Sequence, residues 1–238
     1  ASAALLAACG SSTTESAITP QRFIAFGDAM NDVGQNGSRY TVNDGSVNNW
    51  TLQVVANYGK SLTPVSAGGL SYATGNARVS AKPDAAGNAS TRTVTEQIDA
   101  FLASGSFAAT DVVMVSGGVS DVIAGMAAVN AGTLTQDAMV AAARKAGEDL
   151  AAQVRRLVTA GAKYVVVTGT YDLSKTPWAK AIGREALLSN ASSRFNEGLL
   201  VGIVDLGANV LYVDSAYYVN LYTSVPGNYG FTNSTAAG

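Results

Sequence analysis

Continuous apolar runs and amphipathic stretches alternate along the chain from residue 22 onward. The apolar runs are typical of buried strands and lie at 22–26, near 62–65, and at 111–116, 163–169 and 209–214. Apolar residues that recur at helical spacing predict helices at 47–58, 94–103, 135–160 and about 188–199. This order predicts one α/β domain with three α/β/α layers. Its core is a doubly wound, flavodoxin-like parallel sheet of about five strands.

Local signals mark several boundaries of these elements. Thr93 and Glu96 have the spacing of a capping box, which predicts the start of the helix at 94–103. Gly161 follows the long amphipathic stretch, where a glycine commonly ends a helix. Residues 80–92 show no periodic pattern, so we expect a surface loop there.

Composition narrows the class of protein. The 238 residues are 47% apolar and 13% charged, which suits a single globular domain with a sizeable core. The net charge of −2 argues against a nucleic-acid partner. The sequence contains no histidine. This matters because histidine is the most common general base in enzymes.

The first twenty residues are predicted to lie outside the fold, which leaves 21–238 as the folded domain. The stretch "ASAALLAACGSS" is typical of the end of a signal peptide. Leu6 to Cys9 also resembles a bacterial lipobox, in which Cys9 is lipidated, although an export signal with an incidental cysteine has the same composition. We expect an exported protein, either an envelope lipoprotein anchored to a membrane through Cys9 or a secreted one.

Three polar, glycine-containing segments follow predicted strands. They are "GDAMNDVG" at 27–34, "GGLSYATGNARV" at 68–79 and "SGGVSDVIAG" at 116–125. The carboxyl ends of parallel strands meet at one edge of the sheet, and ligands bind there in open α/β folds. We therefore expect these three segments to converge on one site.

The first segment resembles the first conserved block of the GDSL, or SGNH, family of esterases and lipases. That block reads Gly-Asp-Ser, two variable residues, Asp, one variable residue and Gly. Gly27, Asp28, Asp32 and Gly34 match it, and Ala29 stands at the position of the nucleophilic serine. The resemblance extends over about residues 21–238 and is closest to the longer bacterial and plant-type members. It implies an SGNH hydrolase fold.

The resemblance also implies roles in the other two segments. Gly75 falls at the position of the oxyanion glycine. The third block, Gly-x-Asn-Asp, reads Gly118-Val119-Ser120-Asp121, so Ser120 replaces the asparagine that donates to the oxyanion. Ser120 either only caps the following helix or also donates a hydrogen bond to the oxyanion. Gly118 and Asp121 are expected to support this segment, as Asp28 and Asp32 support the first.

The last family block, Asp-x-x-His, is absent from these 238 residues, so the general base and its aspartate are not in this chain. We expect the C-terminal segment that carries them to have been cleaved or to lie outside this sequence. That segment is then a candidate partner of the domain.

The sequence therefore predicts an ester hydrolase with a Ser nucleophile and an Asp-His pair, seen in an inactive form. Ala29 is either an engineered change or a natural one. The alternative is a pseudoenzyme that binds a lipid or glycan ester without hydrolysing it. A flavodoxin-like cofactor site is disfavoured, because two carboxylates in the first turn would repel a phosphate. We expect a small-molecule or lipid ester as ligand, with no cofactor and no metal.

Overall fold

A four-stranded parallel sheet forms the centre of the molecule in the computed structural model, which describes residues 17–41 and 44–236. The strands are β1 (Arg22–Phe26), β2 (Asp111–Ser116), β3 (Tyr164–Thr168) and β4 (Val210–Val213), and they lie in that order. Phe26 pairs with Val115, and Val115 pairs with Val167, so the carboxyl ends of the first three strands are level. The parallel α/β architecture that the sequence predicted is confirmed, and these four strands coincide with predicted ones.

The prediction of a fifth strand near 62–65 is wrong. Pro64 has no backbone N–H to give to a ladder, and Val65–Ala67 forms a 3-10 turn instead. The outer edge of β1 is covered by a later segment around Ser71, which forms a parallel bridge with Ala25. The sheet of the described residues therefore has four strands, with this bridge at its β1 edge.

Seven α-helices surround the sheet in the described parts of the chain. They are α1 (Trp50–Asn57), α2 (Val94–Leu102), α3 (Val119–Asn130), α4 (Gln136–Thr159), α5 (Pro177–Ile182), α6 (Glu185–Ile203) and α7 (Ser215–Ser224). Short 3-10 turns occupy η2 (Leu173–Lys175) and η3 (Pro226–Tyr229). The predicted capping box of α2 is confirmed, with Thr93 accepting from Glu96 and Glu96 accepting from Thr93. Residues 80–92 form a loop, as expected.

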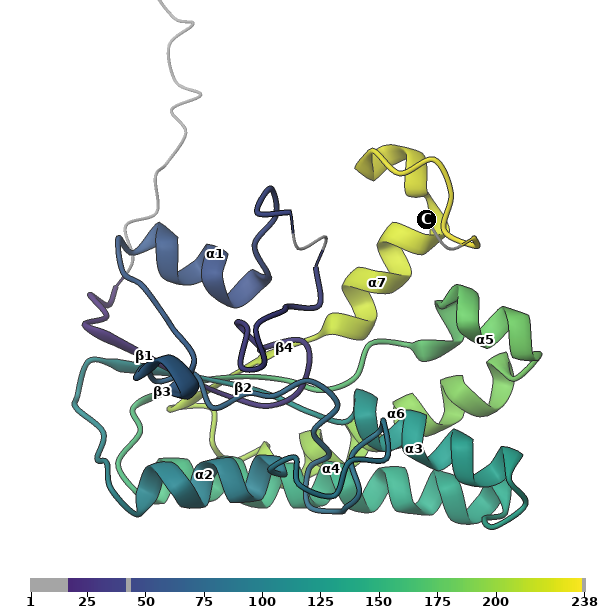
Figure 1. The fold of residues 1–238 in the computed structure, drawn as a ribbon, viewed down its shortest axis with the longest axis horizontal. Helices are drawn as coiled ribbons and strands as arrows, with labels where there is room; N and C mark the ends of the chain where they lie inside the picture. Colours follow the sequence, from purple (N-terminus) through teal and green to yellow (C-terminus); the bar gives the residue numbers. More distant parts are fainter. Residues whose placement is uncertain (1–16, 42–43, 237–238) are drawn as a thin grey trace, which may run out of the picture.

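The two faces of the sheet are covered very unequally. One face packs on α2, α3, α4 and α6 through a large core that includes Ile24, Phe26 and Leu150. The other face carries a small core in which β1 and β2 meet Val55 of α1. Figure 1 shows α1 and α7 on this second side, apart from each other.

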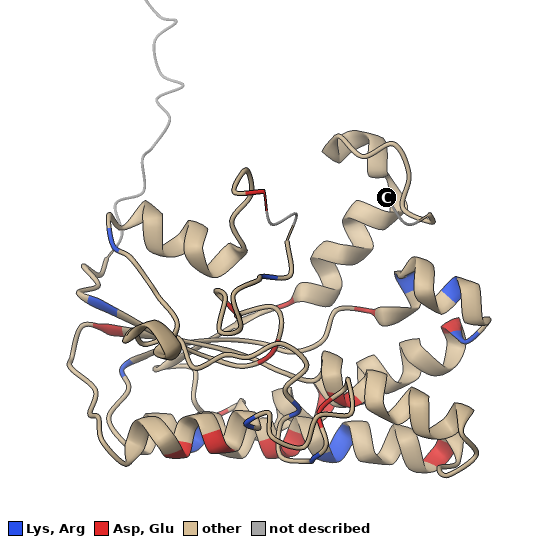
Figure 2. Cartoon of the chain, viewed as in Figure 1, with Lys and Arg blue, Asp and Glu red and all other residues tan. Residues whose placement is uncertain are grey.

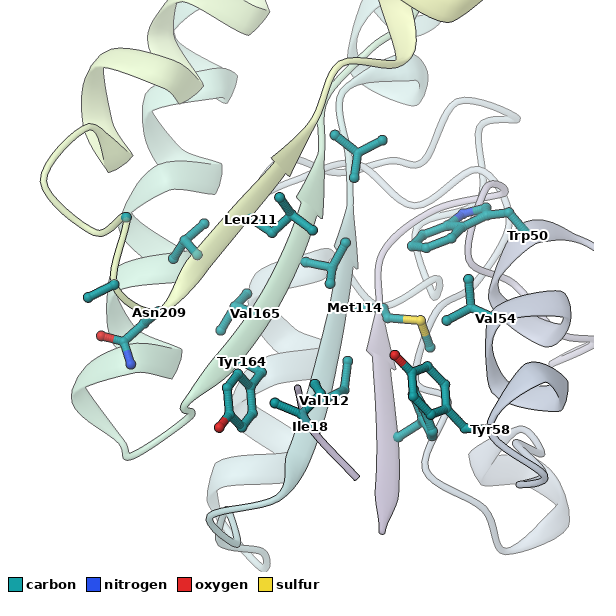
Figure 3. A pocket seen from close by; sticks show the side chains of 16 residues that line it. Ile18, Trp50, Val54, Tyr58, Val112, Met114, Tyr164, Val165, Asn209 and Leu211 are labelled. Atoms are coloured by element: carbon teal, nitrogen blue, oxygen red, sulfur yellow. The ribbon is translucent and has the colours of Figure 1, made fainter. Parts of the chain in front are cut away.

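Strands β3 and β4 are therefore open on the α1 side. A groove of about 500 Å³ runs between α1 and β4, and sixteen residues line it without a single charged side chain (Figure 3). Leu211 of β4 is 62% exposed there. The indole N–H of Trp50 is buried and has no hydrogen-bond partner among the described residues. Parallel sheets are normally covered on both faces, so this bare apolar surface is unusual.

The charged residues follow the same division. Figure 2 shows many of them on α2, α3, α4 and α6 and on the loops beside these helices. Residues 215–236, which include α7 and η3, contain no Lys, Arg, Asp or Glu. None of the described helices is both long enough and apolar enough to cross a bilayer.

The close approach of α4 to α6 gives a test of the packing. Gly147 of α4 lies so near α6 that a Cβ there would overlap the carbonyl oxygen of Phe195. Alanine favours a helix over glycine by about 1 kcal/mol, yet we expect Gly147→Ala to lower the free energy of unfolding by about 1–3 kcal/mol, because the overlap is with backbone.

Urea denaturation of Gly147→Ala measures this effect. The control is Gly207→Ala, because a Cβ at Gly207 meets no atom within 4 Å. The control should stay within about 0.5 kcal/mol of the unmodified protein. A Gly147→Ala protein as stable as the control would contradict the close packing of α4 on α6.

Candidate functional site

The turn after β1 is tight and is braced from β2. Gly27 has φ of 138°, and a Cβ on it would lie 2.7 Å from the carbonyl oxygen of Ser116. Asp28 follows, fully buried, and its Oδ1 accepts hydrogen bonds from Ser116 Oγ at 2.8 Å and from the Met30 N–H at 3.2 Å. Ala29 is thereby held, partly exposed, at the carboxyl end of β1.

The carboxyl of Asp28 sits in an environment that favours its neutral form. Burial raises its pKa, while the bond from Ser116 acts against that rise. Its Oδ2 has no hydrogen-bond partner. A buried carboxylate with an unpaired oxygen is costly, so the protonated acid is the more stable form over a wider pH range than for an exposed aspartate.

Asp32 connects the first turn to the second segment. Its Oδ1 accepts from the N–H groups of Gly34 at 2.9 Å and Gln35 at 2.8 Å. Its Oδ2 accepts from the N–H of Gly75 at 2.7 Å. Thr74 adds a bond from its N–H to the Gly27 carbonyl at 3.0 Å. The two segments are therefore held together as expected.

The bond to Asp32 changes the interpretation of Gly75. Its N–H is already donated to a carboxylate, so the oxyanion-donor role that the resemblance implied for Gly75 is not supported by this geometry. The next residue, Asn76, has φ of 65° and is the one described residue other than glycine with a positive φ. Sequence analysis did not single it out.

The third segment begins α3 in a way that corrects one interpretation of Ser120. The N-cap of α3 is Gly118, with φ of 108° and no side-chain capping bond, so Ser120 is not a helix cap. The helix begins at Val119, earlier than expected, which places Ser120 inside its first turn, where it is 4% exposed. Gly118 is required for a second reason, because a Cβ there would lie 2.5 Å from the ring of Phe195. The donor role of Ser120 stays a prediction.

Asp121 fastens the third segment to the second. It accepts from the Val79 N–H at 3.0 Å and pairs with Arg78, whose Nε lies 3.4 Å from Oδ1. Burial raises the pKa of Asp121 to about 6, against the opposing effects of the Val79 hydrogen bond and the Arg78 charge. The hydrogen bond from Ser116 Oγ to Asp28 at 2.8 Å joins the first residue of this segment to the first segment, so the first and third segments also lie close together.

One supporting residue was missed in the sequence. Gln97 of α2 is fully buried and clamps Gly27 from the α2 side of the sheet. Its Oε1 accepts from the Gly27 N–H at 2.8 Å, and its Nε2 donates to the Gly27 carbonyl at 3.0 Å. The available signal was a polar residue on the apolar face formed by Val94, Ile98 and Phe101, where an amide needs a buried partner.

Two other expectations concern metal and lipid. Within residues 17–41 and 44–236, no group of three or more His, Cys, Asp or Glu side chains is arranged to hold a metal ion. Cys9 and the predicted lipobox lie outside the described residues.

Comparison with known proteins gives a family match. The family model of the GDSL-like lipases and acylhydrolases matches residues 23–238. No curated protein matches the chain significantly. A solved crystal structure aligns with 90% of this chain and 86% of its own, at 19% sequence identity and a TM-score of 0.49.

The Gln97 clamp can be tested by removing its polar atoms. Gln97→Leu keeps a similar volume but leaves the Gly27 N–H buried without its partner, while the Gly27 carbonyl keeps only the hydrogen bond from the Thr74 N–H. We expect the free energy of unfolding to fall by about 1–3 kcal/mol, the cost of one unsatisfied buried polar group. The control Gln53→Leu changes an exposed glutamine of α1. Equal stability of the two variants in urea denaturation would contradict the clamp.

Asp121 predicts a specific dependence of stability on pH. Its pKa in the folded state is about 6, above the ordinary value of 3.8, so the folded protein binds more protons than the unfolded chain between these values. The free energy of unfolding therefore falls as pH rises through this window. In Asp121→Asn this contribution is absent. A plot of its free energy of unfolding against pH should therefore have a slope less negative than that of the unmodified protein, by up to about 1.4 kcal/mol per pH unit.

Urea denaturation of both proteins at pH values between about 4 and 6 measures the difference. The amide oxygen of the Asp121→Asn variant can still accept from the Val79 N–H, which limits other effects of the change. Parallel slopes would show that Asp121 is ionised throughout this window.

Proposed function

Because the chain belongs to the family of GDSL-like lipases and acylhydrolases, we propose that it is the body of a carboxylic ester hydrolase whose nucleophile position holds Ala29. The observation that carries the proposal is the rigid turn after β1. Hydrogen bonds with Ser116, Gln97 and Asp32 hold this turn and link it to the Gly75 segment. A side chain at position 29 is thus presented at the carboxyl edge of the sheet by a preorganised support.

The proposed reaction needs a serine at position 29. Its Oγ attacks the ester carbonyl carbon while a histidine takes its proton, and backbone or side-chain donors stabilise the oxyanion that forms. The alcohol leaves with a proton from the histidine, and water then hydrolyses the acyl-enzyme by the same route. Ser120 is proposed as one oxyanion donor. Alanine has no hydroxyl to attack, so the sequence with Ala29 is proposed to be inactive.

The histidine and its aspartate must come from outside these 238 residues, which contain no His. We propose that a C-terminal segment carrying both residues packs on the open face of β3 and β4. Three features support this: the groove is apolar, the Trp50 N–H lacks an acceptor, and a parallel sheet is normally covered on both faces. Val213, which lines the groove, lies at the carboxyl end of β4, on the same edge as the candidate site.

A second function is a pseudoenzyme that binds a lipid or glycan ester without turnover. Ala29 itself favours it, because the supports around this position are intact although the nucleophile is missing. For either function we propose an exported protein. The lipobox-like sequence supports an envelope lipoprotein anchored through Cys9, and a secreted protein is the alternative.

The two functions are separated by restoring the nucleophile. We expect Ala29→Ser in the 238-residue chain to remain nearly inactive towards p-nitrophenyl butyrate, because a serine hydroxyl without a base is a weak nucleophile. The same change in a protein that also carries the sequence encoded after Gly238 should raise kcat/KM by about 10³-fold or more over its Ala29 form.

The matched control is Ala89→Ser, which adds a hydroxyl on the exposed loop and should change nothing. Rapid turnover by the 238-residue Ala29→Ser protein would contradict the need for an external histidine. No gain in the longer protein would favour the pseudoenzyme.

A further inference from the structure

Asn76 holds a left-handed backbone conformation. Its φ of 65° lies in a region that glycine adopts freely, that asparagine tolerates better than most residues, and that other residues adopt at a cost. Its carbonyl accepts from the Ala85 N–H at 3.0 Å, whereas its own N–H makes no hydrogen bond with any described residue. Because the N–H of the preceding Gly75 is held by Asp32, Asn76 offers the first free amide of this segment. Residues other than glycine with a positive φ often lie at functional sites.

Tyr40 lies directly over this segment. A Cβ on Gly75 would lie 2.5 Å from the Cζ atom of Tyr40, so the phenol ring rests against the glycine backbone. The side chain nevertheless remains 56% exposed, and the rest of the ring is open to solvent. The ring thus forms part of the surface that a ligand at Gly75 and Asn76 would meet.

The hydroxyl of Tyr40 lies beside the Gly75 backbone and is therefore close to Asn76, the next residue. Burial raises the pKa of Tyr40, and the charges of Asp32, Asp84 and Asp28 raise it further. The interaction with Asn76 opposes this rise, as expected when the amide group donates to the phenol oxygen. Tyr40 therefore stays a neutral phenol in the pH range where an esterase works.

We propose that Tyr40 is a positioning residue, whose contact with Asn76 keeps that residue in the left-handed conformation and its backbone N–H available to the carbonyl oxygen of a bound ester. This inference rests on the proposed function. It assigns the oxyanion donor of the second segment to Asn76. It also assigns Tyr40, which belongs to none of the three segments with family resemblance, to the site.

The first experiment uses the unmodified chain, whose Ala29 cannot cleave an ester. In a protein labelled with ¹⁵N, added p-nitrophenyl butyrate should shift the backbone amide signals of Asn76 and Ala29. Tyr40→Phe keeps the ring but removes the hydroxyl. We expect it to weaken binding by about three- to tenfold and to reduce the shift of the Asn76 amide at saturation. Tyr218→Phe, on exposed α7, is the matched control and should change neither.

The second variant separates positioning from simple packing. Glycine adopts a positive φ without a brace, so Asn76→Gly should make the protein insensitive to the Tyr40 hydroxyl. In the Asn76→Gly background, Tyr40→Phe should change ester affinity by less than about twofold. A packing role for the phenol would instead give the same loss in both backgrounds, and that result would overturn the proposal.

The outcomes distinguish this proposal from the proposed function. If the ester shifts the Ala29 amide but not the Asn76 amide, the site binds esters and the assignment of Asn76 is wrong. If the ester shifts no amide of the site in the unmodified chain, the proposed function fails first. The inference is supported if Tyr40→Phe reduces the shift of the residue 76 amide when residue 76 is asparagine, but not when it is glycine.

Discussion

The carboxylate of Asp32 is the interaction on which the candidate site depends. Asp32 is 2% exposed, and its carboxylate accepts hydrogen bonds from three backbone N–H groups. Two of these groups belong to its own turn, and the third belongs to Gly75, which is 43 residues away in the sequence. A carboxylate that is fully hydrogen-bonded in this way is a strong, directional brace. It sets the distance between the turn after β1 and the Gly75 segment, and it occupies the N–H of Gly75, whereas the N–H of Asn76 has no partner among the described residues.

The fold was predictable where local sequence and tertiary environment agree. The run at 111–116 is buried on both faces, so its uninterrupted apolar pattern predicted β2 with the correct ends. The capping box at Thr93 was equally local. The prediction of a strand near 62–65 failed because the outer edge of β1 pairs with the segment around Ser71 through a single bridge. Neither of these two segments has an apolar pattern that indicates which of them pairs with β1.

The residues of the candidate site could be predicted from the sequence more fully than the contacts that these residues make. The family resemblance identified Asp28, Asp32 and Asp121, and the structure shows each of them buried. It did not reveal that the Gly75 N–H is committed or that Asn76 has a positive φ, because both depend on a partner far along the chain. The prediction of a Ser120 cap failed for a simpler reason: the N-cap of α3 is Gly118, which has no side chain to cap with, so Ser120 lies inside the first turn of the helix.

The bare face of β3 and β4 has a consequence for how the domain opens. β2 is buried along its whole length and hydrogen-bonded on both sides, whereas β4 is an edge strand whose residues are at least partly exposed. Local unfolding is cheapest where few apolar contacts are lost. The molecule therefore has a graded hierarchy of opening, in which the amides of β4 and α7 exchange with solvent long before those of β1 and β2. The half of the sheet that carries the turn with Ala29 is also the half that opens last.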